Sequence, residues 1–289
     1  MNMNRSVDSL KAFMGSGDRS SAHVSAPGVT VVGSGKGGVG TSVVSILLAL
    51  EAHRRGERVL LIDADESVGS LHMMLGILDP GPGLGALRGG QIAPEQLLAA
   101  VAPGFMLLSG GGGGVDMTLS SAAAERRALM RRISGLYEQF TTIIVDGGSR
   151  LDSVMASCGA GAERLVCVTA QDRISLAASY ALFKVARARF EPLPVELIVN
   201  GVDEAPGRSL HAIVRAATQA FLGTDVSFGG AIPFDPYVDD ALTTGGSLAH
   251  VHPLSPAAAA AAGVMHRLLH ERMLASGEAT PVIPLYERV

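Results

Sequence analysis

A glycine-rich segment at residues 33–42 carries the clearest chemistry in this sequence. It reads Gly-Ser-Gly-Lys-Gly-Gly-Val-Gly-Thr-Ser, and it lies between an apolar run and a helical pattern. Successive backbone N–H groups of such a loop converge on an anion, and the N-terminus of the following helix adds partial positive charge. The segment therefore predicts a phosphate-binding loop, and the alternative is an ordinary glycine-rich turn between a strand and a helix.

The spacing within this segment fits the P-loop pattern G-x-x-x-x-G-K-[ST] at every position except one. Gly35 and Gly40 occupy the glycine positions, and Ser42 stands where the hydroxyl that binds Mg²⁺ belongs. Thr41 replaces the lysine that contacts the β- and γ-phosphates, so we expect weaker binding and a larger loss of hydrolysis. Losing one such transition-state group typically costs a factor of ~10²–10³ in rate. The residues expected to line the phosphates are Gly35, Gly37, Gly38, Val39, Gly40, Thr41 and Ser42.

Three aspartates follow apolar runs that read as buried strands. Asp63 and Asp65 occur in the string Ile-Asp-Ala-Asp, and Asp146 ends the run Thr-Ile-Ile-Val-Asp. Residues two apart on an extended segment point the same way. A carboxylate at a strand end beside a phosphate loop typically holds Mg²⁺ directly or through water. We expect a magnesium site at Ser42, Asp63 and Asp146, and the alternative for each aspartate is to cap a turn.

Apolar runs alternate with helical patterns from residue 28 onwards, and these elements must position the polar residues. Near-continuous apolar strands between helices indicate an α/β domain whose mostly parallel, twisted sheet carries helices on both faces. The predicted strands cover 29–33, 58–63, 105–109, 142–146, 165–169, 195–200 and a short run ending near Ile232. The predicted helices cover 42–55 and, roughly, 121–139, 174–189, 208–221 and 255–275.

The predicted P-loop domain spans residues 28–275, between a polar, flexible N-terminal arm at 1–27 and a C-terminal tail at 276–289. No run of 18 or more apolar residues occurs, so we expect no transmembrane helix. The tail contains Pro281 and Pro284, which interrupt a helix. Its few apolar residues predict membrane contact that is weak or absent.

Composition limits the cellular compartment and the partners that we expect. The 289 residues carry a net charge of −4, so the basic excess needed to wrap nucleic acid is missing and no specific nucleic-acid binding is expected. Only two cysteines are present, which fits a reduced, cytosolic setting. The first 28 residues contain no apolar signal-peptide core. We therefore expect a cytoplasmic protein that is peripheral, at most, to the cell pole or the inner membrane.

The string Lys-Gly-Gly-Val-Gly, from Lys36 to Gly40, resembles the deviant Walker A loop of MinD/ParA-family ATPases, K-G-G-x-G-K-[ST]. The resemblance implies ATP or ADP with Mg²⁺ as ligands. It also implies a nucleotide-sandwich homodimer in which Lys36 reaches the partner's nucleotide. Asp65 matches the residue that orients the attacking water, and Asp146 matches the Walker B aspartate.

Both predicted switch segments depart from the family pattern. Ser70 and His72 stand where the first switch of the family continues to an Asn and an Asp. After Asp146 the family reads D-[TS]-x-A-G, whereas this chain reads Asp-Gly-Gly-Ser-Arg. These departures argue against a fast ATPase.

Two further segments resemble the adenine-binding parts of the family. Asn200 ends an apolar run, and a side-chain amide can pair with both a donor and an acceptor on adenine. The alternative is an asparagine in a turn. The string from Gly230 to Asp235, Gly-Ala-Ile-Pro-Phe-Asp, is similar to the family segment G-x-I-P-x-D, which places Pro233 beside the base.

Two groups within the family compete. Residues 174–175 and 180–184 look like the I-T-D-A-Y-A-L-I-K stretch of the FlhG (FleN) regulators of flagellar number and placement. That group implies a spatial regulator with ATP-dependent dimerisation, weak ATPase activity and a partner such as an FlhF-like GTPase or a flagellar component. The TadZ/CpaE group of pilus-assembly proteins often lacks the P-loop lysine. It implies a pseudo-ATPase scaffold that acts through protein contacts in pilus or secretion-system localisation.

Overall fold

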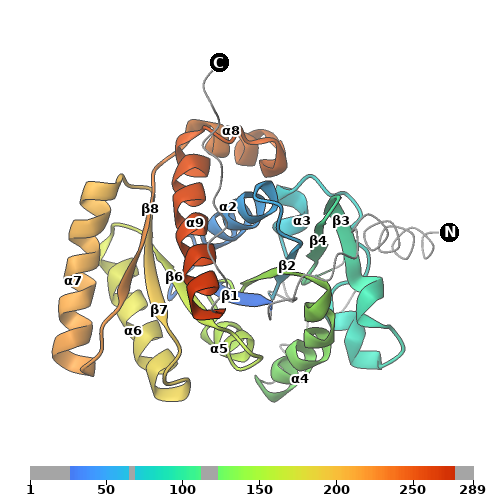
Figure 1. Ribbon diagram of the computed structural model, residues 1–289, viewed down its shortest axis with the longest axis horizontal. Coiled ribbons are helices and arrows are strands. Elements are labelled where there is room, and N and C mark those ends of the chain that lie inside the picture. The colour runs from blue at the N-terminus through green and yellow to red at the C-terminus, as the bar shows by residue number, and fades with distance from the viewer. Residues whose placement is uncertain (1–26, 65–68, 112–122, 277–289) are drawn as a thin grey trace.

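The apolar runs of the sequence form the strands of one sheet. The computed structural model describes residues 27–64, 69–111 and 123–276, and within them the sheet has eight strands (Figure 1). Its strand order is β3-β4-β2-β5-β1-β6-β7-β8, and every neighbouring pair is parallel except β3 and β4. The strands are β1 (Gly28–Gly33), β2 (Val59–Asp63), β3 (Leu98–Ala102), β4 (Phe105–Leu108), β5 (Thr142–Asp146), β6 (Arg164–Thr169), β7 (Val195–Asn200) and β8 (Ser227–Ile232). The predicted α/β architecture is confirmed.

Helices cover both faces of this sheet because the central strands are apolar on both sides. Val31 of β1 packs into one core and its neighbour Val32 into the other, as the alternation of side chains along a strand requires. The helices α2 (Thr41–Arg54), α8 (Pro236–Thr244) and α9 (Pro256–Ser276) supply one core. The other contains residues of α4 (Ala123–Ile133), α5 (Leu151–Cys158), α6 (Arg173–Arg189) and α7 (Glu204–Leu222).

Several short elements escaped prediction. Strand β3 pairs with β4 as an antiparallel hairpin, and its Ala-rich sequence carries little strand signal. The predicted helix at 121–139 ends at Ile133 and continues as a 3₁₀ helix over Ser134–Gln139, whereas α7 begins at Glu204, before the predicted start. Pro206 does not prevent this start, because the first turn of a helix has no N–H partners to lose. Also unpredicted were α5, α8, α3 (Leu71–Met74) and 3₁₀ turns at Leu84–Gly89, Pro94–Leu97 and Leu248–His250.

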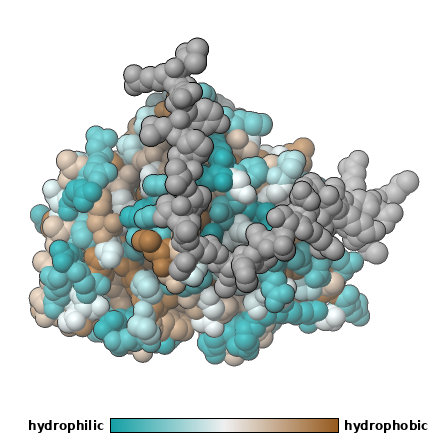
Figure 2. All heavy atoms as spheres, viewed as in Figure 1, coloured by the Kyte–Doolittle hydropathy of each residue, from teal (hydrophilic) through white to brown (hydrophobic). Residues whose placement is uncertain are grey.

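The outer edge of β8 lies in a groove between α7 and α9. The groove has a volume of about 440 Å³ and is lined by small and apolar residues such as Gly230, Ala260 and Val264. Arg208 and Arg267 flank it, and Figure 2 shows apolar surface on the side where α9 and α7 flank β8. Within the described residues, no helix combines the length and the apolar character needed to cross a bilayer.

A network of ion pairs ties α9 to the sheet. Glu196 of β7 is buried, and its two carboxylate oxygens lie 2.7 Å from Arg164 of β6 and 2.7 Å from Arg267 of α9. Both arginines also contact Glu271 of α9, at 2.7 and 3.1 Å. Removing one member of a buried charge network leaves the remaining charges without compensation, so this network is sensitive to single substitutions.

We therefore expect Glu196→Gln to lower the free energy of unfolding by about 2–4 kcal/mol, because two partly buried guanidinium groups then face a neutral amide. Urea denaturation followed by far-UV circular dichroism measures the loss. The matched control is Glu204→Gln, which breaks an ion pair with Arg208 whose side chains are both more than 60% exposed. That pair contributes less than ~1 kcal/mol, and equal losses for the two variants would contradict the buried-network interpretation.

Candidate functional site

The carboxyl ends of five strands bring the predicted site residues to one edge of the sheet. The glycine loop follows β1, which lies between β5 and β6. Asp146 ends β5, and Asp63 ends β2 directly opposite it in the strand register. Asn200 ends β7, and Pro233 follows β8. In open parallel sheets, ligands bind outside the carboxyl ends of the strands, at the point where the strand order reverses.

The loop adopts a conformation that requires glycine at two positions. Gly38 has φ +80° and Gly40 has φ +88°, in the left-handed region that other residues rarely adopt. Gly40 caps α2, whose first helical residue is the buried Thr41. The first turn of α2 contains no acidic side chain, so its partial positive charge remains available to an anion.

Backbone hydrogen bonds join the loop to the segment that follows β5. The N–H of Ser34 donates to the carbonyl of Gly148 at 3.0 Å, and the N–H of Gly147 donates to the carbonyl of Val32 at 2.8 Å. Asp146 accepts a hydrogen bond from the N–H of Gly148 at 3.0 Å. Asp146 and the loop are thus parts of one hydrogen-bonded unit.

Two buried carboxylates lie at the ends of neighbouring strands beside the loop. Asp63 and Asp146 have exposed fractions of 2% and 3%. Asp63 also accepts a hydrogen bond from the N–H of Leu71 at 3.3 Å, which ties it to the start of α3. Asp65, the predicted water-orienting residue, lies outside the described residues.

The residues of this edge fit magnesium in their donor chemistry. Among the residues that the structure describes, no three His, Cys, Asp or Glu side chains gather as a metal cluster. Mg²⁺ seldom needs one, since it usually takes one or two carboxylates together with phosphate oxygens and water. Ser42 and Asp146 offer such hard oxygen donors next to the loop, with Asp63 on the adjacent strand.

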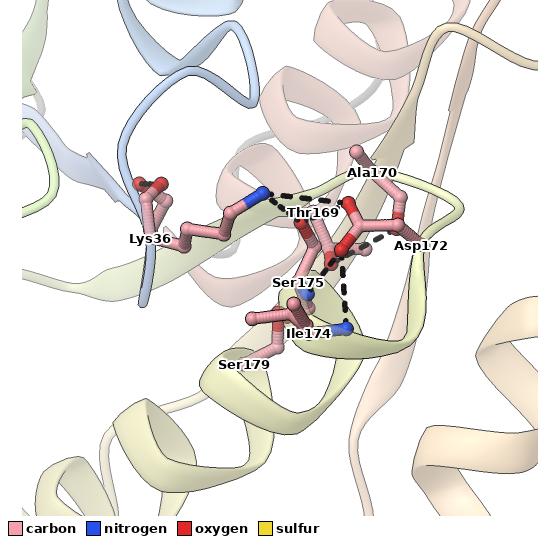
Figure 3. A network of polar contacts seen from close by, with 8 residues as sticks. Lys36, Thr169, Ala170, Asp172, Ile174, Ser175 and Ser179 are labelled. Carbon is pink, nitrogen blue, oxygen red and sulfur yellow. Dashed lines mark hydrogen bonds and ion pairs between the residues drawn. The ribbon is translucent and has the colours of Figure 1, made fainter.

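Lys36 folds back onto its own chain (Figure 3). Its Nζ lies 3.6 Å from Asp172 Oδ2 and 3.4 Å from Ser175 Oγ, at the N-terminus of α6. Asp172 caps that helix by accepting from the N–H groups of Ile174 and Ser175, and Ser175 Oγ donates to it at 2.5 Å. The hydrogen bonds from Ser175, with Lys36 nearby, lower the pKa of Asp172 from 3.8 to about 2. Sequence reasoning missed Asp172, although an Asp that stands just before a helical pattern is a helix-start signal.

Helix α6 also presses against the first half of the loop. A Cβ atom added to Gly35 would lie 2.1 Å from the carbonyl oxygen of Ala178, a backbone atom in the middle of a helix. A Cβ atom on Gly37 would meet only Ser149 Oγ, at an ordinary 3.5 Å. Steric exclusion therefore explains glycine at position 35, independently of any ligand.

Of the predicted adenine-binding residues, Asn200 lies against the C-terminal part of the loop. Asn200 Nδ2 donates to the carbonyl of Val39 at 2.9 Å, so this side chain contacts the loop itself. Asp235, two residues after Pro233, caps two helices, because it accepts from the N–H groups of Tyr237 in α8 and Ala257 in α9, each at 2.9 Å. The segment beside β8 thus fixes where α8 and α9 begin.

Comparisons with known proteins agree with this geometry. The sequence model of the ParA family, described as NUBPL iron-transfer P-loop NTPase, matches residues 26–100. The antiactivator FleN of Pseudomonas aeruginosa is 25% identical over 241 residues, covering 83% of this chain and 85% of FleN. The flagellum site-determining protein YlxH of Helicobacter pylori is 27% identical over 201 residues, covering 69% of this chain and 67% of YlxH.

The fold is likewise that of a solved nucleotide complex. The septum site-determining protein MinD of Pyrococcus horikoshii, complexed with Mg-ADP, superposes with a TM-score of 0.68. The two chains are 21% identical, and the match covers 88% of this chain and 99% of that one.

The packing of α6 predicts unequal effects of alanine at two loop glycines. Gly35→Ala should lower the free energy of unfolding by about 1–3 kcal/mol, since the loop or α6 must shift to admit the methyl group. Gly37→Ala, the matched control, should cost less than ~1 kcal/mol, because its methyl group meets no backbone atom. Urea denaturation without nucleotide isolates this packing effect from ligand binding. Equal costs would show that α6 does not confine the loop.

The capping network predicts how Asp172 titrates. Because its pKa is lowered, the carboxylate keeps its stabilising interactions above the ordinary value of 3.8 and loses them only as the pH falls through about 2. Its carboxyl carbon, followed by NMR, should not titrate between roughly pH 5 and pH 3. Ser175→Ala should move the midpoint up into that window. Ser179→Ala, one turn further along, should leave it unchanged, and an unmoved midpoint in Ser175→Ala would contradict this account.

Proposed function

We propose that this chain, which is similar to ParA/MinD-family P-loop NTPases, is a MinD-like spatial regulator that binds Mg²⁺–ATP at its glycine loop. The observation that carries this proposal is the loop itself, with left-handed Gly38 and Gly40 before the uncompensated N-terminus of α2. The backbone N–H groups of 35–42 bind the phosphates. Ser42 and Asp146, with Asp63 beside them, hold Mg²⁺, which neutralises phosphate charge.

The absence of the loop lysine makes this proposed enzyme a weak ATPase. Thr41 offers a hydroxyl where the β- and γ-phosphates would otherwise meet a cation. Lys36 can bring its positive charge to the phosphates only if its side chain leaves Asp172 and Ser175, because it forms an ion pair with the first and a hydrogen bond with the second. In the proposed homodimer Lys36 makes that exchange and reaches the partner's phosphates, while Asp65 orients the attacking water.

Exposed apolar side chains beside the loop support such a dimer. Leu151 begins α5 and is 42% exposed, and Ile174 lies in the first turn of α6 and is 70% exposed. These helices follow β5 and β6, the two strands that flank β1. A partner that covers the loop would therefore bury apolar surface on both sides of the nucleotide.

We assign the regulated process to flagellar number or placement, by similarity to FleN and YlxH. In this proposal the ATP-bound dimer binds a protein partner, an FlhF-like GTPase or a flagellar component, at the cell pole or the inner membrane. Slow hydrolysis then returns the protein to the cytoplasm. In this proposal Pro233 borders the adenine.

Thr41 is also the observation that favours a second candidate, a pseudo-ATPase scaffold of the same fold. Such a protein keeps the shape of the loop and acts only through protein contacts, for example in pilus or secretion-system localisation. Nucleotide binding separates the two candidates, because the scaffold does not depend on it.

The decisive test is titration of a fluorescent ATP analogue with Mg²⁺ into the wild-type protein. We expect saturable binding that ATP displaces, and Ser42→Ala should weaken it by reducing Mg²⁺ coordination. Thr41→Lys should tighten binding and raise the rate of hydrolysis by ~10²–10³, the usual contribution of one such transition-state group. No wild-type binding at millimolar ligand would favour the scaffold. Binding without a gain in Thr41→Lys would place the defect in the switch segments.

A further inference from the structure

Asn200 connects β7 to the loop across the intervening strand. In the sheet β7 is separated from β1 by β6, yet Asn200 Nδ2 lies 2.9 Å from the carbonyl oxygen of Val39. The two residues are 161 positions apart in the chain. This side chain therefore donates one of its two amide protons to the loop in the absence of nucleotide.

The same amide packs against the neighbouring glycine. A Cβ atom on Gly40 would lie 2.2 Å from Asn200 Nδ2, so the amide group occupies the space that a side chain at position 40 would need. Val39 is only 4% exposed, and its side chain belongs to the core shared with α2 and α9. The peptide group between Val39 and Gly40 is thus fixed by core packing, by a hydrogen bond and by van der Waals contact.

The direction of this peptide group decides where one loop N–H points. In a trans peptide the C=O and the N–H lie in one plane and point in opposite directions. With the carbonyl of Val39 directed at Asn200, the N–H of Gly40 is directed away from β7. Glycine permits many backbone conformations, so without the Asn200 donor this peptide group loses one of the contacts that hold its orientation.

We propose that Asn200 is a positioning residue of the phosphate loop, which orients the Gly40 N–H for phosphate by holding the Val39 carbonyl. The inference rests on the proposed binding of nucleotide at this loop. It differs from a role in reading adenine, since a positioned loop serves any phosphate chain. Its importance is greater in this chain because Thr41 leaves the backbone N–H groups with a larger share of phosphate binding.

The test compares ligands with and without a base. Mg²⁺–ATP, Mg²⁺–GTP and inorganic tripolyphosphate are titrated into wild type and Asn200→Ala by calorimetry. We expect all three to weaken by the same factor of about 5–10, the usual effect of losing one hydrogen bond. Asn200→Asp keeps the size of the side chain but replaces the donor with a charged acceptor that also repels phosphate, so it should lose at least as much. Weaker ATP with unchanged tripolyphosphate would overturn the proposal in favour of base recognition.

A measurement without nucleotide tests the positioning role of Asn200 independently of the proposed function. The {¹H}–¹⁵N NOE of the Gly40 and Thr41 amides should fall in Asn200→Ala and Asn200→Asp, which reports a loop released from the hydrogen bond. The control is Glu204→Gln, at the exposed start of the next helix, which should change neither these amides nor binding. If wild type binds none of the ligands, the proposed function fails, and unchanged NOE values in both Asn200 variants would overturn the positioning role.

Discussion

The space available to the chain between β1 and α2 is the constraint on which the site depends. A Cβ atom at Gly35 would clash with α6, and one at Gly40 would clash with Asn200. Val154 of α5 lies 2.7 Å from where a Cβ atom of Gly33 would be. At these three positions only a residue without a side chain fits. The bare backbone that packing imposes is also what exposes N–H groups to an anion, so one steric requirement produces both the fold of the loop and its chemistry.

Charge around the loop follows from the same arrangement. The loop contributes one basic side chain, Lys36. Helix α6 contacts the loop through the backbone of Ala178, and its N-terminal cap, Asp172, forms an ion pair with Lys36. Packing therefore delivers Lys36 to Asp172 and Ser175 when no partner is present. In the proposed dimer, contacts of at least equal strength would have to replace these, so the exchange of Lys36 would be part of the free energy of dimerisation.

The sequence predicts what local patterns and strand topology determine. The carboxyl ends of parallel strands meet at one edge, so recognising the strands that end at Asp146 and Asn200 is enough to place both residues on the edge that carries the loop. The tie between Lys36 and Asp172 was not predictable in this way, because it depends on how a helix packs against a loop far away in sequence. Strand β3 was missed for a different reason, because an Ala-rich edge strand is stabilised by its hairpin with β4 and carries little sequence pattern of its own.

The paired aspartates give a physical argument about which candidate function suits the site. Asp63 and Asp146 stand opposite each other on neighbouring parallel strands, whose backbones lie about 5 Å apart. Both side chains are almost fully buried, and each accepts a backbone hydrogen bond, Asp63 from Leu71 and Asp146 from Gly148. Buried carboxylates need partners of this kind because removing them from water costs free energy. Two such oxygen donors beside a glycine loop suit a divalent cation held together with phosphate, so the acidic pair favours the nucleotide-binding candidate over a scaffold that never binds nucleotide.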